Sequence, residues 1–254
     1  MDNSKDLESQ VRIADEWFGS AIKNINDINP EELHMHDDFI HFYEMEDNIF
    51  YYPKISSDAE SLVNDIELLN QIVVEENISD SPIPAWKAWE ASGGKSDEEL
   101  RDAGREITPY TFGWHKTIHQ ENIMSYKNPK IQDLIFSIYK RINPPIVLAS
   151  KHYAYKKGID IGRLSPNSIS KYDVGKFMGP HVDSYGDERE PVLSVVLYLN
   201  SDYEGGELYF PNQDIKIKPE TGSAVVFPSV EPYFHTSLEI KSGYKYISPG
   251  FWYK

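Results

Sequence analysis

Two side chains that could bind a metal lie close together in GKFMGPHVDSYGD, residues 175–187: His181 and Asp183. One residue separates them, so both side chains point the same way if the segment is extended. His235, in the strand-like run YFHTSLEI, is the candidate third ligand. Two imidazoles and one carboxylate on one face suit a non-haem Fe(II) ion and leave coordination positions open. The alternative for His181, taken alone, is an ordinary turn histidine.

The composition restricts the chemistry that is open to the chain. There is no cysteine among the 254 residues, which excludes disulfides, zinc fingers, iron–sulfur clusters and cysteine nucleophiles. The formal net charge of −16 argues against nucleic acid and anionic membranes as partners. No apolar run approaches the length of a membrane span, and the first residues lack an apolar signal core. We therefore expect a cytoplasmic protein without a membrane segment.

Two segments between residues 48 and 150 have helical periodicity. Apolar residues recur at helical spacing in SSDAESLVNDIELLNQIV, residues 56–73. The second segment, NPKIQDLIFSIYKRINPP, has a capping Asn128 followed by Pro129, an arrangement typical of a helix N-terminus. We expect this helix to end at Pro144, since proline interrupts helical hydrogen bonding.

The pattern changes to short β-rich runs in the last third of the chain. Gly, Pro, Asn or Asp bounds each run. The runs are SISKYDVG, VLSVVLYL, GGELYF, DIKIKP, GSAVVFP, HTSLEI and YKYISPGFWY. Many short strands at close spacing favour a sandwich or jelly roll, whose mouth can hold a metal. The predicted class is therefore α+β, with helices first and a β-rich core second.

Residues 172–254 resemble the 2-oxoglutarate- and Fe(II)-dependent dioxygenases, in particular the prolyl 4-hydroxylase-like branch. Tyr172 lies nine residues before His181, and Lys245 lies ten residues after His235, as is usual in that family. Between them, the YLN and GGE segments and the Gly–Phe segment follow in the family order. The matching stretches are YDVGKFMGPHVD, VLSVVLYLNSDYEGGELYFP, GSAVVFPS and HTSLEIKSGYKYISPGFWY.

The resemblance implies a double-stranded β-helix (jelly-roll, cupin-like) core and an oxidative reaction. His181, Asp183 and His235 would bind Fe(II), with 2-oxoglutarate and O2 as co-substrates and ascorbate as a further ligand. The reaction would convert 2-oxoglutarate to succinate and hydroxylate a peptide or protein, most plausibly at proline. The alternatives are another residue or a free small molecule as substrate, or a non-catalytic cupin-like module that binds a metal or ligand.

The resemblance also implies how 2-oxoglutarate is bound. Lys245 would pair with its distal carboxylate and Tyr172 would hydrogen-bond it. A buried lysine needs an anionic partner, which supports this role; the alternative is a Lys245 that points into solvent. Leu208 stands where the family usually has a threonine after GGE. Ser194 and Tyr198 are therefore further candidates for 2-oxoglutarate binding.

Three residues are candidates for contact with the hydroxylated substrate. Met178 stands where the family often has a tyrosine, and Trp252 is adjacent to Phe251, where the family has a tryptophan. Arg189, in the loop after the H-x-D segment, is placed to meet a substrate carbonyl or carboxylate; the alternative is a solvated loop cation. These departures concern the substrate side of the site and leave the three candidate metal ligands unchanged.

The expected domain organisation is an acidic extension, residues 1–47, before a dioxygenase domain, residues 48–254. The jelly-roll core would cover about residues 150–254, and the glycine-containing stretch 79–127 is a candidate lid over the site. The cluster HMHDD, residues 34–38, is more simply an acidic surface segment than a second metal site. The composition suggests a microbial, viral or phage protein, and the sequence does not indicate the oligomeric state.

Overall fold

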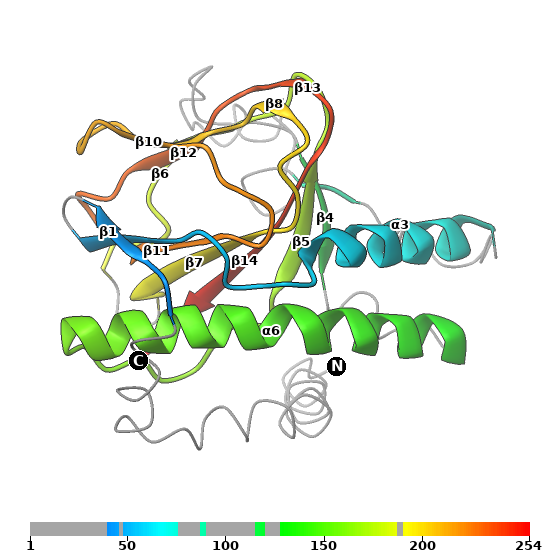
Figure 1. The fold of residues 1–254 in the computed structure, drawn as a ribbon, viewed down its shortest axis with the longest axis horizontal. Helices are drawn as coiled ribbons and strands as arrows, with labels where there is room; N and C mark the ends of the chain where they lie inside the picture. Colours follow the sequence, from blue (N-terminus) through cyan, green and yellow to red (C-terminus); the bar gives the residue numbers. More distant parts are fainter. Residues whose placement is uncertain (1–39, 46–47, 76–86, 90–114, 120–127, 187–189) are drawn as a thin grey trace, which may run out of the picture.

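The structure is a computed structural model, and its described residues form two facing β-sheets with two helices on one side (Figure 1). The described residues are 40–45, 48–75, 87–89, 115–119, 128–186 and 190–254. Most of the predicted extension 1–47 (residues 1–39, 46 and 47), the cluster 34–38 and most of the candidate lid therefore lie outside them. Neither of the two described helices is both long enough and apolar enough to cross a membrane.

The larger sheet has eight strands among the described residues, in the order β1-β2-β11-β7-β14-β5-β4-β3. Every neighbouring pair in it is antiparallel. Its strands are β1 (Tyr43–Met45), β2 (Ile49–Tyr52), β3 (Lys87–Trp89), β4 (His115–His119), β5 (Ser168–Tyr172), β7 (Leu193–Tyr198), β11 (Ala224–Pro228) and β14 (Lys245–Trp252). The strands predicted in the last third are confirmed, while β3 and β4 lie within the stretch 79–127, the candidate lid, where no strand was predicted.

The smaller sheet lies on the side of the larger sheet that faces away from the long helix (Figure 1). It contains β10 (Ile215–Ile217), β9 (Leu208–Phe210), β12 (His235–Ser237) and β6 (Met178–His181), in that order. A short antiparallel pair, β8 (Glu204–Gly205) and β13 (Ile240–Ser242), extends this region. The functional residues predicted from the sequence are distributed over both sheets.

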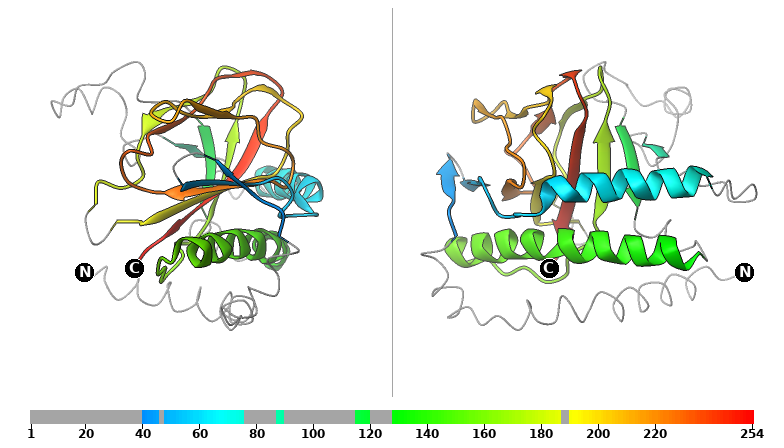
Figure 2. Two further views of the ribbon diagram at one scale, coloured as in Figure 1. Left: turned by 60° about the vertical axis from the view of Figure 1, so that its left-hand side comes forward. Right: turned by 45° about the vertical axis from the view of Figure 1, so that its right-hand side comes forward.

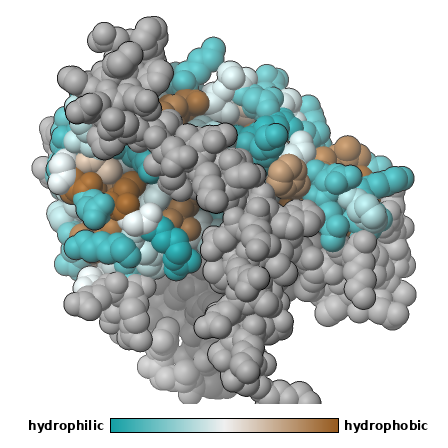
Figure 3. All heavy atoms as spheres, turned by 90° about the horizontal axis from the view of Figure 1, so that it is seen from below, coloured by the Kyte–Doolittle hydropathy of each residue, from teal (hydrophilic) through white to brown (hydrophobic). Residues whose placement is uncertain are grey.

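The helices α3 (Ala59–Glu75) and α6 (Pro129–Lys157) pack on each other and cover the larger sheet (Figure 2). As predicted, Asn128 caps α6: its side chain accepts a hydrogen bond from the Lys130 backbone N–H. Seen from below, much of the visible described surface is hydrophilic, with hydrophobic side chains in small separate areas (Figure 3). Leu62 of α3 and Ile138 of α6 belong to one hydrophobic cluster with strands of the larger sheet, so the helices bury one face of that sheet.

The predicted end of this helix at Pro144 is wrong. Helix α6 continues through Pro144 and Pro145 to Lys157. A proline inside a helix removes a backbone donor and costs roughly 3 kcal/mol. The segment after the prolines carries apolar side chains that are fully buried against the sheet, Ile146 among them. Burial of this long apolar face offsets the cost of the prolines, and local propensity cannot reveal such tertiary packing.

The larger sheet separates two hydrophobic clusters. Leu193, Val195 and Leu197 of β7 belong to the cluster under the helices. The alternate residue Tyr198 belongs to the second cluster, between the two sheets. This alternation follows from the two-residue period of a strand. Polar residues on the second face of the larger sheet are consequently directed toward the space between the sheets.

Candidate metal and co-substrate site

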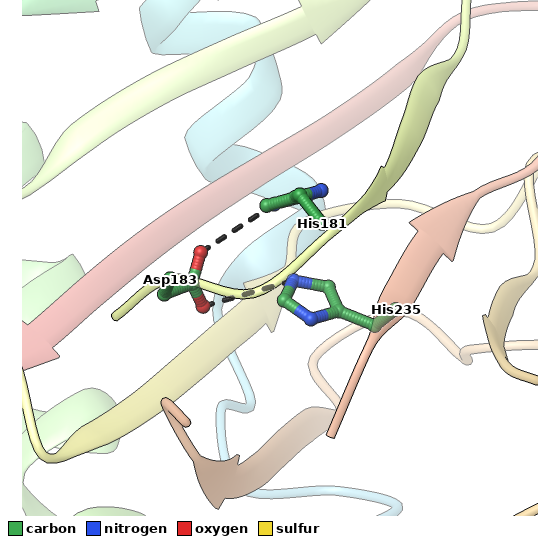
Figure 4. A group of neighbouring side chains, drawn as sticks. All are labelled: His181, Asp183 and His235. Atoms are coloured by element: carbon green, nitrogen blue, oxygen red, sulfur yellow. Dashed lines mark ion pairs between the residues drawn. The ribbon is translucent and has the colours of Figure 1, made fainter. Parts of the chain in front are cut away.

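His181, Asp183 and His235 converge in the structure. One possible ligand atom from each lies within 4.8 Å of the other two. The Nε2 atom of His181 is 3.4 Å from Asp183 Oδ1, and the Nε2 atom of His235 is 3.7 Å from Asp183 Oδ2 (Figure 4). The H-x-D segment is thus more than a polar turn, because it faces a histidine from another strand.

Strand pairing brings the two histidines together. His181 ends β6, His235 begins β12, and the two residues are partners across this antiparallel pair. The chain after β6 is then tied to the end of β11, where the backbone N–H groups of Asp183 and Ser184 both donate to the Ser229 carbonyl. These backbone contacts place the Asp183 carboxylate beside both imidazoles.

Both imidazoles are oriented by backbone carbonyls. His181 Nδ1 is 2.8 Å from the Gly179 carbonyl oxygen, and His235 Nδ1 is 3.2 Å from that of Tyr233. A carbonyl accepts only, so each Nδ1 carries a proton, and in the neutral form of each ring the Nε2 lone pair faces the cluster. Metal-ligating histidines are held in this way, with the second ring nitrogen donating to a carbonyl or carboxylate.

The charges of the cluster also suit a divalent metal. Burial would raise the pKa of Asp183, but His235, His181 and a hydrogen bond from Ser194 outweigh it and lower that pKa. Burial lowers the pKa of His235 to about 4, so this imidazole is neutral at pH 7. For His181, burial acts downward, while contact with Asp183 raises the pKa above its usual value. The result is an ionised carboxylate beside two nitrogen ligands.

Ser194 acts on the cluster and not on the predicted co-substrate position. Its hydroxyl donates to Asp183 Oδ2 at 2.6 Å and lies 2.8 Å from the Ser229 hydroxyl. Since Ser194 has one proton, Ser229 is the donor in the second contact. The predicted role of Ser194 in 2-oxoglutarate binding is thus replaced by a role in orienting Asp183.

A cavity of about 340 Å³ lies between the sheets and contains all three residues of the cluster. Its volume is within the range of small-molecule sites. Its walls are Ser168, Ser170, Tyr172, Met178, His181, Val182, Asp183, Val196, Tyr198, Leu208, His235, Ser237, Lys245, Ile247, Pro249 and Phe251. Predicted metal, co-substrate and substrate residues therefore share one cavity.

Lys245 is the buried cation of this cavity. Its side chain is among the largest fully buried ones, and Nζ donates to the Gly206 carbonyl and the Ser237 hydroxyl, both at 2.7 Å. The rings of Tyr172 and Tyr198 each have their centre 5.4 Å from Nζ. Burial lowers the pKa of Lys245 to about 7, with Glu207 opposing the shift. A buried ammonium with this pKa favours an anionic ligand, because the anion would stabilise the charged form.

The glycines of the GGE segment allow this arrangement. Gly205 and Gly206 have φ angles of 75° and 66°, which side chains other than glycine rarely tolerate. A Cβ on Gly205 would lie 2.1 Å from the Glu239 carbonyl oxygen, and one on Gly206 would lie 2.3 Å from Ile240 Cδ1. Glycine at position 206 thus lets the backbone carbonyl reach Lys245.

The three predicted substrate residues have different outcomes. Met178 lines the cavity. The prediction for Trp252 is wrong: it is buried in the cluster under the helices, and the preceding Phe251 lines the cavity instead. Adjacent strand residues face opposite sides, which explains the exchange. Arg189 lies outside the described residues.

Several residues that line the cavity were not predicted from the sequence. Ser237 is the most informative, because it contacts Lys245 directly. It stands two residues after His235 on β12, so the two-residue period of a strand would have directed attention to it. Ser168 and Ser170 on β5 also line the cavity, but no motif marked them.

Residues 168–254, which contain the whole cluster and Lys245, match the family model of the 2OG-Fe(II) oxygenase superfamily. This match confirms the predicted resemblance for the segment. The family description specifies Fe(II) and 2-oxoglutarate, and the oxygenase class uses O2, in agreement with the predicted cofactors. The His181, Asp183 and His235 cluster fits the iron site of such a family.

Relatives of this chain include proteins described as hydroxylases. A putative prolyl 4-hydroxylase of Acanthamoeba polyphaga mimivirus is 28% identical over 149 residues, covering 53% of this chain and 57% of the relative. A PKHD-type hydroxylase of Prochlorococcus marinus (strain NATL2A) is 30% identical over 149 residues, covering 55% and 62%. The chain thus spans less than two thirds of the length of these relatives.

Among solved structures, the viral collagen prolyl hydroxylase of Paramecium bursaria Chlorella virus-1 is similar with a TM-score of 0.43. It is 18% identical, and the match covers 81% of this chain and 96% of that one.

Proposed function

We propose that the chain is an Fe(II)- and 2-oxoglutarate-dependent dioxygenase with a double-stranded β-helix core formed by its two facing sheets. The observation that carries the proposal is one cavity that holds both a His-Asp-His cluster and a buried lysine. The family match of residues 168–254 supports it. The division into an extension, residues 1–47, and a dioxygenase domain, residues 48–254, belongs to the same proposal, with the end of the extension joined to the domain through β1. A cytoplasmic location is proposed as well.

The residues present fit the iron and its co-substrate. Two Nε2 lone pairs and an ionised carboxylate form a facial donor set for Fe(II), which leaves positions for a chelating ligand and O2. The charges of Asp183 and protonated Lys245 cancel. Fe(II) adds two positive charges and 2-oxoglutarate two negative ones, so the loaded cavity is neutral, as its apolar walls require.

Each residue has a proposed task in the reaction. When bound, Fe(II) would let O2 oxidise 2-oxoglutarate to succinate and CO2, with one oxygen atom entering succinate and the other entering the new hydroxyl group of the substrate. His181, Asp183 and His235 hold the metal on one side only. Lys245 binds the distal carboxylate of 2-oxoglutarate, which fixes the orientation of its chelating end. Burial of the cavity between the sheets limits access of water.

We further propose a peptide or protein substrate, with proline as the first residue to test. The curated relatives are called prolyl 4-hydroxylase and PKHD-type hydroxylase, which supports a hydroxylation reaction. Met178, Pro249 and Phe251 add uncharged walls to the cavity, so an uncharged target group fits better than an ionised one. Hydrogen bonds from Tyr172 and Tyr198 to 2-oxoglutarate, and binding of ascorbate, remain predictions.

An anaerobic absorbance titration tests the proposal. The purified chain receives Fe(II) and then 2-oxoglutarate, and the visible charge-transfer band of a chelated complex is recorded. We expect the band with the wild-type chain and its loss in His181→Ala and His235→Ala, whose far-UV spectra should stay unchanged. If Fe(II) binds and no band forms, the chain is a metal-binding module and the proposed activity is wrong.

Lys245→Ala tests the 2-oxoglutarate site independently of the metal site. The variant should bind Fe(II) like the wild type, because Lys245 is not one of the three proposed ligands. Its affinity for 2-oxoglutarate should fall by about 1.5–3 kcal/mol, the usual loss for a hydrogen bond to a charged group. An unchanged affinity would place the co-substrate anchor elsewhere.

A further inference from the structure

We infer that Ser237 and Lys245 together form the seat for the distal carboxylate of 2-oxoglutarate, with the serine hydroxyl as its second donor. The inference rests on the proposed function and adds a residue to it. Ser237 is buried, on β12, and lines the same cavity as Lys245 and the His-Asp-His cluster. An ammonium and a hydroxyl side by side offer one proton to each oxygen of a carboxylate.

The Lys245 ammonium and the Ser237 hydroxyl each keep one proton that can be donated to a ligand. Lys245 Nζ has three protons when charged and directs two of them to the Gly206 carbonyl and the Ser237 hydroxyl. Ser237 accepts in that contact, so its own proton is not used there. Among the described residues, no acceptor for this proton is seen. One proton of the ammonium and one of the hydroxyl thus remain for a ligand in the cavity.

The neighbouring strand explains why the serine is needed. Leu208 of β9 also lines the cavity and offers no hydroxyl where the related family usually has a threonine. Ser237 and Leu208 are direct partners across the antiparallel pair β12–β9. Side chains of such partners lie next to each other on one face. The hydroxyl is therefore supplied from the adjacent strand, within hydrogen-bonding distance of the same lysine.

The position of Ser237 relative to His235, a proposed metal ligand on the same strand, also suits this role. Ser237 follows His235 by two residues, and both side chains line the cavity. A ligand that extends from the metal cluster to Lys245 therefore passes along one strand, with its chelating end toward His235 and its carboxylate toward Ser237. This direction agrees with a linear 2-oxo dicarboxylate and assigns the serine to the end remote from the metal.

The test compares Ser237→Ala with Ser168→Ala. Ser168 is a matched control, because it lines the same cavity but stands four residues along β5 from Tyr172, the strand partner of Lys245. Binding of 2-oxoglutarate to the anaerobic Fe(II)-loaded chain is measured by calorimetry, and Mn(II) binding to the metal-free chain reports on the metal site. We expect Ser237→Ala to weaken 2-oxoglutarate binding about tenfold or more, while Mn(II) affinity and Ser168→Ala stay at wild-type values.

Two further variants keep the test decisive. Ser237→Thr retains the hydroxyl and should recover most of the affinity, whereas Ser237→Gly removes it and replaces the alanine variant if that one does not fold. Wild-type affinity in Ser237→Ala or Ser237→Gly, or equal losses of 2-oxoglutarate and Mn(II) binding, overturns the inference. If the wild-type chain itself does not bind 2-oxoglutarate, the proposed function fails, and that result is distinct from the loss of a single donor.

Discussion

At the scale of single residues, hydrogen bonds from outside the cluster prepare the metal ligands. Carbonyl groups fix the Nδ1 proton of both histidines, and Ser194 holds one oxygen of Asp183. Without these contacts the rings and the carboxylate would have to lose rotational freedom on binding the metal. The metal affinity of the site therefore depends on residues that do not touch the metal.

Ser194→Ala should weaken metal binding while the fold persists. The variant removes the donor to Asp183 Oδ2, which lets the carboxylate rotate and raises its pKa. We expect the affinity for Mn(II) or Fe(II) to fall about 10- to 100-fold, the usual effect of removing such an outer partner. Competition with a chelating dye measures it.

Ser248→Ala is the control for this prediction. Ser248 is also a buried serine of the larger sheet, but its hydroxyl donates to the Ser168 carbonyl, away from the cluster. Its metal affinity should equal that of the wild type. A loss of the same size in both variants would mean that Ser194 contributes general stability and does not orient the ligand.

At the scale of elements, close backbone packing at Gly205 and Gly206 shapes the end of the cavity that contains Lys245. Where β8 pairs with β13, a Cβ on Gly205 would lie only 2.1 Å from the backbone oxygen of Glu239. The next residue, Gly206, turns its carbonyl toward Lys245. This part of the site thus depends on backbone conformation as much as on side chains.

Gly206→Ala should lower both stability and 2-oxoglutarate affinity. The new methyl group would meet Ile240 and Tyr203, and the φ of 66° disfavours any Cβ. We expect a loss of about 1–3 kcal/mol in the free energy of unfolding, measured by urea denaturation. Displacement of the carbonyl acceptor should also weaken 2-oxoglutarate binding, measured by calorimetry.

Gly175→Ala distinguishes the clash from the backbone effect. Gly175 has a φ of 79°, but a Cβ there meets nothing within 4 Å. Gly175→Ala should therefore lose stability through the positive φ, as Gly206→Ala does, but keep wild-type affinity for 2-oxoglutarate. Equal affinity losses in the two variants would contradict the role of the Gly206 carbonyl.

At the scale of the whole molecule, the two faces of the larger sheet have different roles: one packs against the helices and stabilises the fold, and the other lines the candidate site. Its helix side carries the larger apolar cluster, and its other side faces the cavity. The two sides are linked through the same strands, since alternate residues of β7 and β14 contribute to each. Substitutions under the helices should therefore change stability without changing the ligand set.

Ile146→Ala tests this division. Ile146 is fully buried on α6 and lies close to Gly250 of β14. Its truncation should cost about 2–5 kcal/mol in the free energy of unfolding, through lost burial and a residual cavity. Urea denaturation measures the loss, and metal affinity should stay unchanged in the folded fraction.

Lys140→Ala provides the reference on the same helix. Lys140 is exposed, so its truncation should change stability by no more than about 0.5 kcal/mol. A stability loss in Ile146→Ala no larger than in Lys140→Ala would mean that α6 does not depend on this contact. Loss of metal binding in folded Ile146→Ala would contradict the separation of the two faces.

Sequence alone determined the features that depend on residue type and local spacing. The short β-rich runs, the capped start of α6 and the candidate ligands His181, Asp183 and His235 all follow from such patterns. Lys245 was implied by the resemblance to the dioxygenase family, in which a basic residue follows the second histidine by ten positions. These features are local or involve residue types with few other uses in a buried strand, so one sequence carries enough information to identify them.

Only the tertiary structure decided the features that depend on the face of a strand or on remote packing. Ser194 contacts Asp183, Ser237 contacts Lys245, and Phe251 lines the cavity in place of Trp252. A shift of one residue along a strand moves a side chain to the opposite face, and strand pairing sets which face is inside. The continuation of α6 through Pro144 has a similar origin, because packing against strands distant in sequence stabilises a helix that local propensity would end.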